Sequence, residues 1–368
     1  MTIYKPLSSD DKVSTKTLLH EAIPITGTIL SGAYDDNNIQ DFAHGMFQSV
    51  YDYPYLSSSA NHIFDISFGF HGDSGLYTAT TTDYQKEKKK NIYNQMAQVL
   101  MGYNKDGNIQ RFDEDGNLAG DGGTKITEAV FLPFSRLLVK DEIKKGSFQM
   151  TIGATETYAE DGSVFTETMT VKDYGAATAY KVNSPAGEYG ILYASNSAGS
   201  NQLKGDPGAT DLPCGLVYYQ AGVAVLTASL FMSGAGGQGS SGYLSASCEW
   251  DSAGNSLTGS LTGSMISSSA NGLRTRVQNI QFNNTIELNS TVYFCRVKHN
   301  EFNYSSNPTY LSGSQIRVKN ETTDIPISYI TSIGLYSADN ELLAVGKFSE
   351  PIRKDSNIEM TFRARLDY

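Results

Sequence analysis

The chain has 368 residues, which is enough for two or three domains or for one large β-rich domain. It contains 28 Lys and Arg against 39 Asp and Glu, and the net charge of −11 disfavours general nucleic-acid binding, which needs a basic face. The 35 glycines, the 23 tyrosines and a charged fraction of only 18% disfavour a helical bundle and favour many short strands joined by turns.

The N-terminal segment Met1–Leu19 is polar and lacks the apolar core of a secretory signal, so we expect synthesis in the cytoplasm. The longest apolar run, Gly215–Met232, is interrupted by polar residues and predicts buried strands instead of a membrane span. The three cysteines (Cys214, Cys248 and Cys295) are far apart and odd in number, so we expect neither a disulfide framework nor a zinc site.

The first third of the chain predicts an arm, a short helix and a strand. Residues 1–30 are expected to form an N-terminal arm that ends in a short strand-like run, and its polar part, Met1–Leu19, is expected to be fixed only in an assembly. Phe42, Met46 and Phe47 are spaced as on a short helix. In Asn61–Phe70, polar and apolar side chains alternate, which predicts a half-buried strand.

The segment Lys86–Tyr103 predicts the clearest helix of the chain. Apolar residues recur there at spacings of four, three and four, which places them on one face: Ile92, Met96, Val99 and Tyr103. Four lysines at the start of this helix are expected to form a solvated face: Lys86, Lys88, Lys89 and Lys90.

The middle of the chain predicts strands and Asp-Gly turns. A strand is expected over Phe131–Leu138 and a short helical turn over Lys140–Lys145. A hairpin is expected from Phe148–Thr155 and Ser163–Val171, and two more strands from Tyr174–Ala194. After a loop at Ser195–Ala209 and around a second loop at Ser233–Gly242, further strands are expected over Leu216–Met232, Tyr243–Trp250, Leu257–Ser267, Val277–Phe282 and Thr285–Val297.

The last segment, Thr309–Tyr368, predicts four strands in a compact C-terminal domain: Ile316–Lys319, Ser328–Tyr336, Glu341–Lys347 and Ile358–Leu366. The predicted fold is mainly β with a few short helices (α+β), with several domains and a C-terminal β-sandwich or barrel-like domain. The predicted divisions are an arm (1–30), a mixed α+β domain (31–150), a β-rich domain (151–290) and a C-terminal β domain (291–368).

Two segments resemble functional motifs but fail their chemical requirements. Asp113–Asn117 is acidic, but an EF-hand loop starting at Asp113 would have Leu118 at position 6 and Thr124 at position 12, so we expect an exposed turn. Gly234–Gly239 matches GxGxxG, but no helical pattern follows it to bind a phosphate. The sequence predicts no catalytic residue, no metal ligand and no cofactor, and therefore a protein that is not an enzyme.

Three tyrosines surround Pro54, and an extended chain would place Tyr51, Tyr53 and Tyr55 on one face. Such a face is suited to a protein interface, because tyrosine gives a large contact area at low entropy cost. A tyrosine ladder packed over a sheet edge and a carbohydrate platform remain alternatives.

The segment Ser328–Phe348 resembles the strand–turn–strand found in virion proteins of tailed bacteriophages, including tail-collar and tail-fibre attachment domains. Three other segments resemble parts of structural proteins from large contractile-tailed phages: Asn91–Leu100, Gly215–Leu226 and Arg296–Tyr310.

This resemblance implies a structural protein of the tail, baseplate or neck, located in the virion, with copies of itself and other virion structural proteins as partners. It implies neither nucleic-acid nor membrane binding. The hairpin Ile333–Phe348 would then dock a partner, through Ile333, Leu335, Tyr336, Leu342, Leu343 and Phe348. A head- or vertex-associated virion protein and a carbohydrate-binding adhesin are alternatives, although the adhesin is disfavoured by the single tryptophan, Trp250. A hydrolase would need two carboxylates about 5 to 9.5 Å apart in a cleft.

Overall fold

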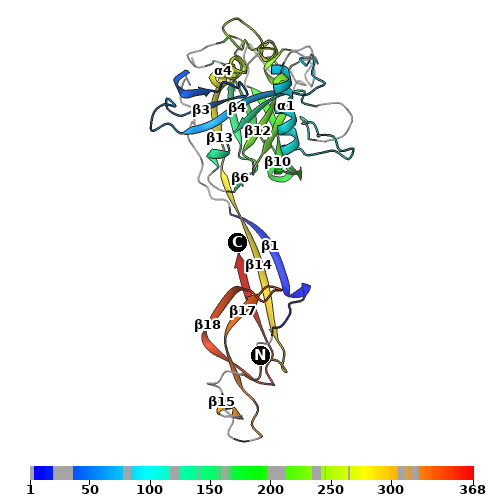
Figure 1. Cartoon of the computed structure of the whole chain (residues 1–368), viewed down its shortest axis with the longest axis vertical. Helices are drawn as coiled ribbons and strands as arrows, with labels where there is room; N and C mark the ends of the chain where they lie inside the picture. The colour runs from blue at the N-terminus through cyan, green and yellow to red at the C-terminus, as the bar shows by residue number, and fades with distance from the viewer. Residues whose placement is uncertain are drawn as a thin grey trace. The chain divides into compact units, whose positions relative to one another are not determined.

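A computed structural model shows a mainly β protein with a few helices, as the composition predicts. The chain divides into two compact units, each described by itself: unit 1 (Met1–Leu18 and Glu287–Tyr368) and unit 2 (Leu19–Ile286). Figure 1 shows the elements of both units. The structure describes residues 4–19, 36–77, 84–116, 125–138, 141–155, 157–158, 165, 167–196, 212–233, 242–244, 246–263, 266–305, 311–312, 315–316, 321 and 323–368.

Unit 2 is built on one eleven-stranded sheet in which every described strand pair is antiparallel. Its strands, in spatial order, are β13 (Val277–Gln281), β7 (Gln149–Gly153), β8 (Thr168–Lys172), β10 (Gly187–Asn196), β11 (Leu212–Tyr218), β12 (Val223–Thr227), β5 (Glu128–Pro133), β4 (His62–Phe70), β3 (Phe47–Tyr51) and β2 (Ile39–Asp41), with β9 (Lys181–Ser184) also paired to β10. The central strands are buried on both faces, which explains the long apolar run around β11 and β12.

One face of this sheet is covered by α1 (Tyr84–Leu100), which lies against β4 and β5 (Figure 1). Its buried side chains Ile92, Tyr93 and Leu100 form a core with residues of β5 and β12. The helix comes very close to the sheet at Gly69, where an added Cβ would lie 2.8 Å from the backbone of α1. The predicted helix and the strand at residues 61–70 are therefore present. The strand is buried on both faces instead of half-buried, because α1 covers its second face, and Val99 and Tyr103 of the predicted apolar helix face are exposed.

The lysines at the start of α1 do not all form a solvated face, as the sequence predicted. Lys89 is only 2% exposed, and its ammonium donates to the carbonyl oxygens of Leu261 (2.5 Å) and Gly263 (2.7 Å). Lys90 contacts Glu87 and the hydroxyl of Tyr77. The prediction is wrong for Lys89 and Lys90, because their ammonium groups form hydrogen bonds with oxygen atoms of unit 2.

The other face of the sheet is covered by helices in a region where the sequence predicted strands. Here α3 (Leu257–Leu261) and α4 (Ser267–Arg276) replace the predicted strand over Leu257–Ser267, and most of the predicted strand Tyr243–Trp250 is irregular. The hydroxyl of Ser256 accepts from the amide of Gly259 and caps α3, while Leu257 and Leu261 share its buried face. The four-residue spacing of these leucines places both on the buried side of a helix, although Thr258 between them has a low helix propensity.

Three shorter predictions also differ from the structure. The segment Phe42–Phe47 is a turn that leads into β3, and not a helix. The expected helical turn at Lys140–Lys145 contains β6 (Glu142–Ile143), which pairs with the start of β14 (Asn284–Val297). The remaining short elements are η1 (Ser9–Asp11), η2 (Asp36–Asn38), η3 (Ser135–Leu137), α2 (Ala176–Ala179) and η4 (Ala228–Phe231).

The division of the chain also differs from the predicted one. The predicted boundary between residues 150 and 151 falls inside β7, and β5 from the first predicted domain pairs with β12 from the second. Residues 31–150 and 151–290 thus share one sheet. The predicted arm is also split, because residues 12–19 form β1 (Lys12–Leu19), a strand beside β14. Residues 20–35 lie outside the described residues.

Unit 1 consists of small sheets. β14 pairs with β1 and with β19 (Met360–Asp367), and β17 (Ser328–Tyr336) pairs with β18 (Leu342–Lys354). A short hairpin joins β15 (Leu311–Ser312) and β16 (Gln315–Ile316). The rings of Phe348 in β18 and Phe362 in β19 lie 4.8 Å apart, and none of the sheets in the described part of unit 1 closes on itself. None of the helices in the described ranges is long and apolar enough to cross a membrane.

Candidate functional site

The hairpin of unit 1 contains six of the predicted interface residues. Its strands β17 and β18 pair Ile333 with Gly346 and Leu335 with Ala344, and the turn between them holds Asn340 at a φ of 64°. The register divides its side chains between two faces, because neighbouring residues of a strand point to opposite sides. The strand–turn–strand predicted at Ser328–Phe348 is confirmed.

One face of the hairpin points into unit 1. Ile333, Leu335 and Phe348 lie on this face and are half-buried. Phe348 reaches Phe362 of β19, which brings the hairpin against the second layer of unit 1. These three predicted interface residues are therefore less accessible to a partner than the residues of the opposite face.

The opposite face of the hairpin is apolar and exposed. Tyr336 is 42% exposed, Leu342 is 54% and Val345 is 60%, while Leu343, at a bulge in the ladder, is 67% exposed. The ring of Tyr336 lies over Gly334, where a Cβ would be 2.8 Å from it. We call Tyr336, Leu342, Leu343 and Val345 the hairpin patch. The sequence prediction did not include Val345. Neighbouring residues of a strand point to opposite faces, so Val345 lies on the exposed face when Ala344 lies on the inner one.

The N-terminal segment belongs to the same surface of unit 1. The ring of Tyr4 packs edge-on against Tyr336 at 4.8 Å. Ion pairs fasten the segment to the long strand β14 and the turn after it: Lys5 with Glu301, Asp11 with Arg296, and Lys16 with Glu287. The side chains described in β1 (residues 12–17) are nevertheless all exposed, including Val13 at 46%.

Unit 1 buries very little apolar surface for its size. It comprises 100 residues, yet among those that the structure describes only Val292 and Val297 are buried apolar side chains. Both hydrophobic cores of the described chain consist of residues of unit 2. A domain of this size normally buries more than about 60% of the surface that its unfolded chain exposes. The packing within one chain therefore accounts poorly for the stability of unit 1.

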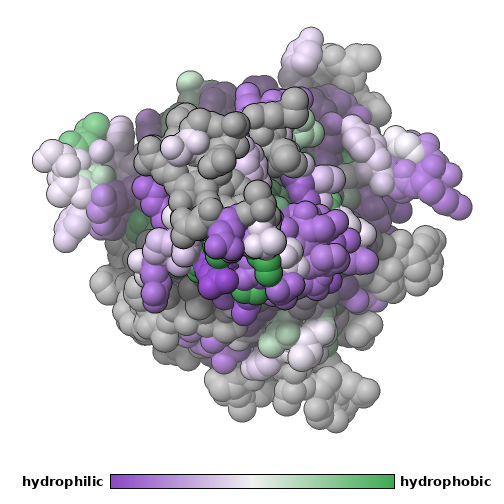
Figure 2. All heavy atoms as spheres, turned by 90° about the horizontal axis from the view of Figure 1, so that it is seen from below, coloured by the Kyte–Doolittle hydropathy of each residue, from purple (hydrophilic) through white to green (hydrophobic). Residues whose placement is uncertain are grey.

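The charges of the protein are divided unevenly between the units. Unit 1 contains 12 Lys and Arg and 12 Asp and Glu, so its net charge is zero. Unit 2 contains 16 Lys and Arg and 27 Asp and Glu, which gives the whole net charge of −11. On the face drawn in Figure 2, green hydrophobic areas are small and lie between purple hydrophilic ones. Copies of unit 1 can therefore approach one another without net repulsion.

The predicted tyrosine group lies in unit 2, at the end of β3. The chain leaves the strand after Tyr51 and turns, so residues 52–59 are not extended as the sequence predicted. The rings of Tyr51 and Tyr55 lie 6.0 Å apart, and Tyr53 is 56% exposed. Tyr51 is half-buried, and its ring edge meets the imidazole of His62 at 5.4 Å.

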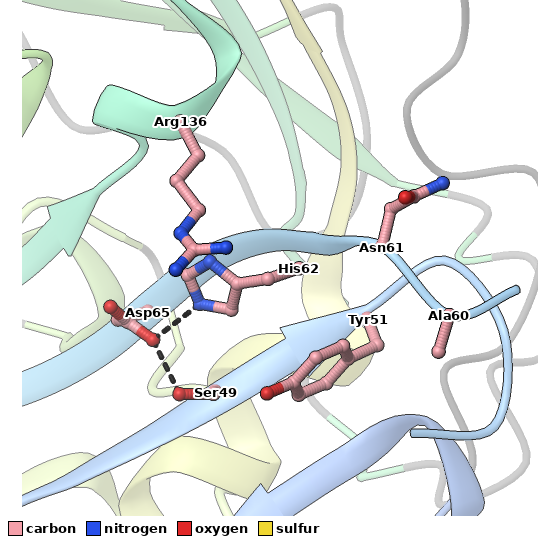
Figure 3. Close-up of a pocket in the computed structure, with 7 residues that line it drawn as sticks. All are labelled: Ser49, Tyr51, Ala60, Asn61, His62, Asp65 and Arg136. Carbon is pink, nitrogen blue, oxygen red and sulfur yellow. Dashed lines mark hydrogen bonds and ion pairs between the residues drawn. The ribbon is translucent and has the colours of Figure 1, made fainter. Parts of the chain in front are cut away.

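Beside Tyr51 lies a cavity of about 340 Å³ lined by Ser49, Tyr51, Ala60, Asn61, His62, Asp65 and Arg136. Figure 3 shows the hydrogen bonds at its base, where one oxygen of Asp65 accepts from Ser49 (2.6 Å) and pairs with Nε2 of His62 (2.7 Å). In a Ser–His–Asp triad the histidine lies between the other two, so that it can take the proton of the serine. Here the carboxylate lies in the middle, and the order excludes that mechanism for Ser49.

The acidic segment at Asp113 is more deeply buried than the predicted exposed turn. Asp113 pairs with Lys125, and Glu114, only 2% exposed, accepts a hydrogen bond of 2.6 Å from the hydroxyl of Tyr243. Gly116 has a φ of 66°, as a turn requires. In the described ranges no three His, Cys, Asp or Glu side chains are grouped to hold a metal ion. The Gly234–Gly239 segment lies outside the described residues.

No family model, no curated protein and no solved structure matches this chain. Two regions present apolar or charged side chains to the solvent in an arrangement suited to a partner or a ligand. They are the hairpin patch of unit 1 and the cavity beside Tyr51 in unit 2.

Proposed function

We propose that the chain is a structural subunit of a tailed-bacteriophage virion, in the tail, baseplate or neck, and that it assembles with copies of itself through unit 1. The observation that carries the assembly proposal is the small number of buried apolar side chains in the described part of unit 1. The phage assignment rests on the resemblance of Ser328–Phe348 to strand–turn–strand segments of virion proteins.

The energetics of folding favour a partner for unit 1. Ordering a residue costs about 1 to 2 kcal/mol of backbone entropy, and burial of apolar surface is the main term that offsets it. Unit 1 leaves Leu342, Leu343 and Val345 in water, although burying each would contribute about 1.5 to 3 kcal/mol. A subunit whose apolar side chains are covered only on assembly has a stability that depends on its concentration.

A second copy of the chain is the occupant that the charges favour. Unit 1 is neutral and its charges are mixed, so two copies can pair Lys and Arg of one with Asp and Glu of the other. A strongly charged partner would not be attracted to such a surface, because a neutral surface does not raise its rate of association. Exposed strands such as β1 and β18 also carry apolar and hydroxyl side chains that are suited to packing against another sheet.

The proposal is tested by sedimentation velocity on the full chain. We expect discrete oligomers for the wild type and association weakened by about 100-fold or more in Val345→Asp, because assembly would bury an unpaired carboxylate. The matched control is Leu56→Asp, which places the same charge at an 84% exposed leucine of unit 2 and is expected to change nothing. A wild type that stays monomeric, or an equal loss in both variants, contradicts the proposal.

A further inference from the structure

The cavity beside Tyr51 has groups that the assembly of unit 1 does not use. Its volume of about 340 Å³ is at the lower end of the range for small-molecule sites, which fits a ligand of one or two rings. All its lining residues belong to unit 2, and most of them are polar. Such a cavity is filled by water unless a ligand offers matching hydrogen-bonding groups.

The first unmatched group is Nδ1 of His62. The carboxylate of Asp65 accepts from Ser49 and, in the tautomer that this network favours, also from Nε2–H of His62. The other ring nitrogen, Nδ1, is then an acceptor. It is buried and has no hydrogen-bond partner in the described part of the chain. This nitrogen is closed off from the cavity, so a ligand contacts the accessible side chains beside it instead.

The second unmatched group is the guanidinium of Arg136. This side chain extends from η3 toward the imidazole of His62 (Figure 3). It is exposed, and it makes no hydrogen bond or ion pair with any residue that the structure describes. The planar fork of a guanidinium binds a carboxylate through two parallel hydrogen bonds, and this geometry makes a carboxylate its best partner.

The third feature is an aromatic wall. The ring of Tyr51 lines the cavity, and Tyr55 lies next to it with ring centres 6.0 Å apart. Aromatic rings beside polar groups present an apolar surface to one side of a ligand and hydrogen-bonding groups to its rim. A pyranose ring has this same division between its C–H face and its hydroxyl edge.

We propose that this cavity binds an acidic saccharide unit of the uronic acid type. Its carboxylate pairs with Arg136, and the sugar ring packs on Tyr51. The lining holds one carboxylate, Asp65, and one guanidinium, Arg136, so the two charges offset each other before a ligand binds. The inference is independent of the oligomeric state of unit 1.

The test is a calorimetric titration of the full chain with methyl β-D-glucuronide, with methyl β-D-glucoside as the matched neutral ligand. A ligand of this size is expected to bind with a dissociation constant of about 1 mM. The glucoside is expected to bind at least about 10-fold more weakly, because it lacks the carboxylate. Absence of glucuronide binding, or equal binding of both sugars, overturns the proposal.

Variants then test the individual contacts. Arg136→Gln is expected to weaken glucuronide binding by about 10-fold or more and to leave glucoside binding unchanged. The control is Lys105→Gln, which removes an exposed cation that does not line the cavity and is expected to have no effect. Tyr51→Phe is expected to retain binding and Tyr51→Ala to lose it. Equal affinities in Arg136→Gln and the wild type overturn the role of Arg136.

Discussion

Replacement of Arg276 by alanine is expected to destabilise unit 2 by about 3 to 5 kcal/mol. The side chain is completely buried and lies over the rings of Phe165 (5.1 Å) and Trp250 (5.4 Å). Its guanidinium donates to carbonyl oxygens of four residues from two segments of the chain: Gly153, Thr155 and Thr157 from the first, and Glu249 from the second. Alanine would leave these carbonyls unpaired in a cavity, and burial makes each loss costly.

Urea unfolding followed by tryptophan fluorescence measures this change. Trp250 is the single tryptophan, is fully buried and lies beside Arg276, so its emission reports on this core. Arg111→Ala is the control, because its ion pair with Asp73 is exposed and is worth less than about 1 kcal/mol. Arg276→Lys keeps a charge but not the fork, and it is expected to fall between the two. Equal midpoints for Arg276→Ala and Arg111→Ala would refute the role of Arg276.

The stability of unit 2 is expected to fall as the pH rises from about 4.5 to about 7. Burial raises the pKa of Glu114 to about 7, although the hydrogen bond from Tyr243 lowers it in part. In this window the folded chain holds a proton that the unfolded chain has released, so raising the pH favours unfolding. A shift from the ordinary 4.5 to about 7 corresponds to about 3 kcal/mol between the two ends of the window.

Glu114→Gln is expected to abolish this part of the pH dependence. The amide stays neutral and still offers an oxygen to Tyr243, so the variant matches the wild type near pH 4 and exceeds its stability above pH 7. Asp173, whose pKa burial raises to about 6, contributes a similar slope at lower pH in both proteins and cancels in the comparison. Parallel stability curves for the two proteins between pH 4 and pH 8 would refute the prediction.

Local patterns in the sequence predicted the elements that depend on nearby residues. The spacing of apolar residues in Lys86–Tyr103 predicted α1, and the alternation in Asn61–Phe70 predicted β4. The turn before Glu341 predicted the hairpin of β17 and β18. The helix α3 was missed because Thr258 and a repeated Thr-Gly pattern outweighed the spacing of two leucines. Its cap by Ser256 was the available signal.

Features that depend on contacts between distant residues could not be predicted from local sequence patterns. The boundary predicted at residue 150 is wrong because β5, before it, pairs with β12, which follows it much later in the chain. The cavity unites Arg136 with Asp65 and Ser49, which no spacing relates. The exposed hairpin patch could be predicted in part from alternation, but the scarcity of buried side chains around it in unit 1 depends on the packing of its sheets.

The central claim, that copies of the chain complete unit 1, is tested most directly by hydrogen exchange. Full-length protein is compared at concentrations well above and well below its dissociation constant, with peptides from β17 and β18 in unit 1 and from β11 and β12 in unit 2. We expect the unit 2 peptides to be protected in both samples, and the unit 1 peptides to be protected only in the oligomer. Equal protection of β17 and β18 in monomer and oligomer would contradict the account.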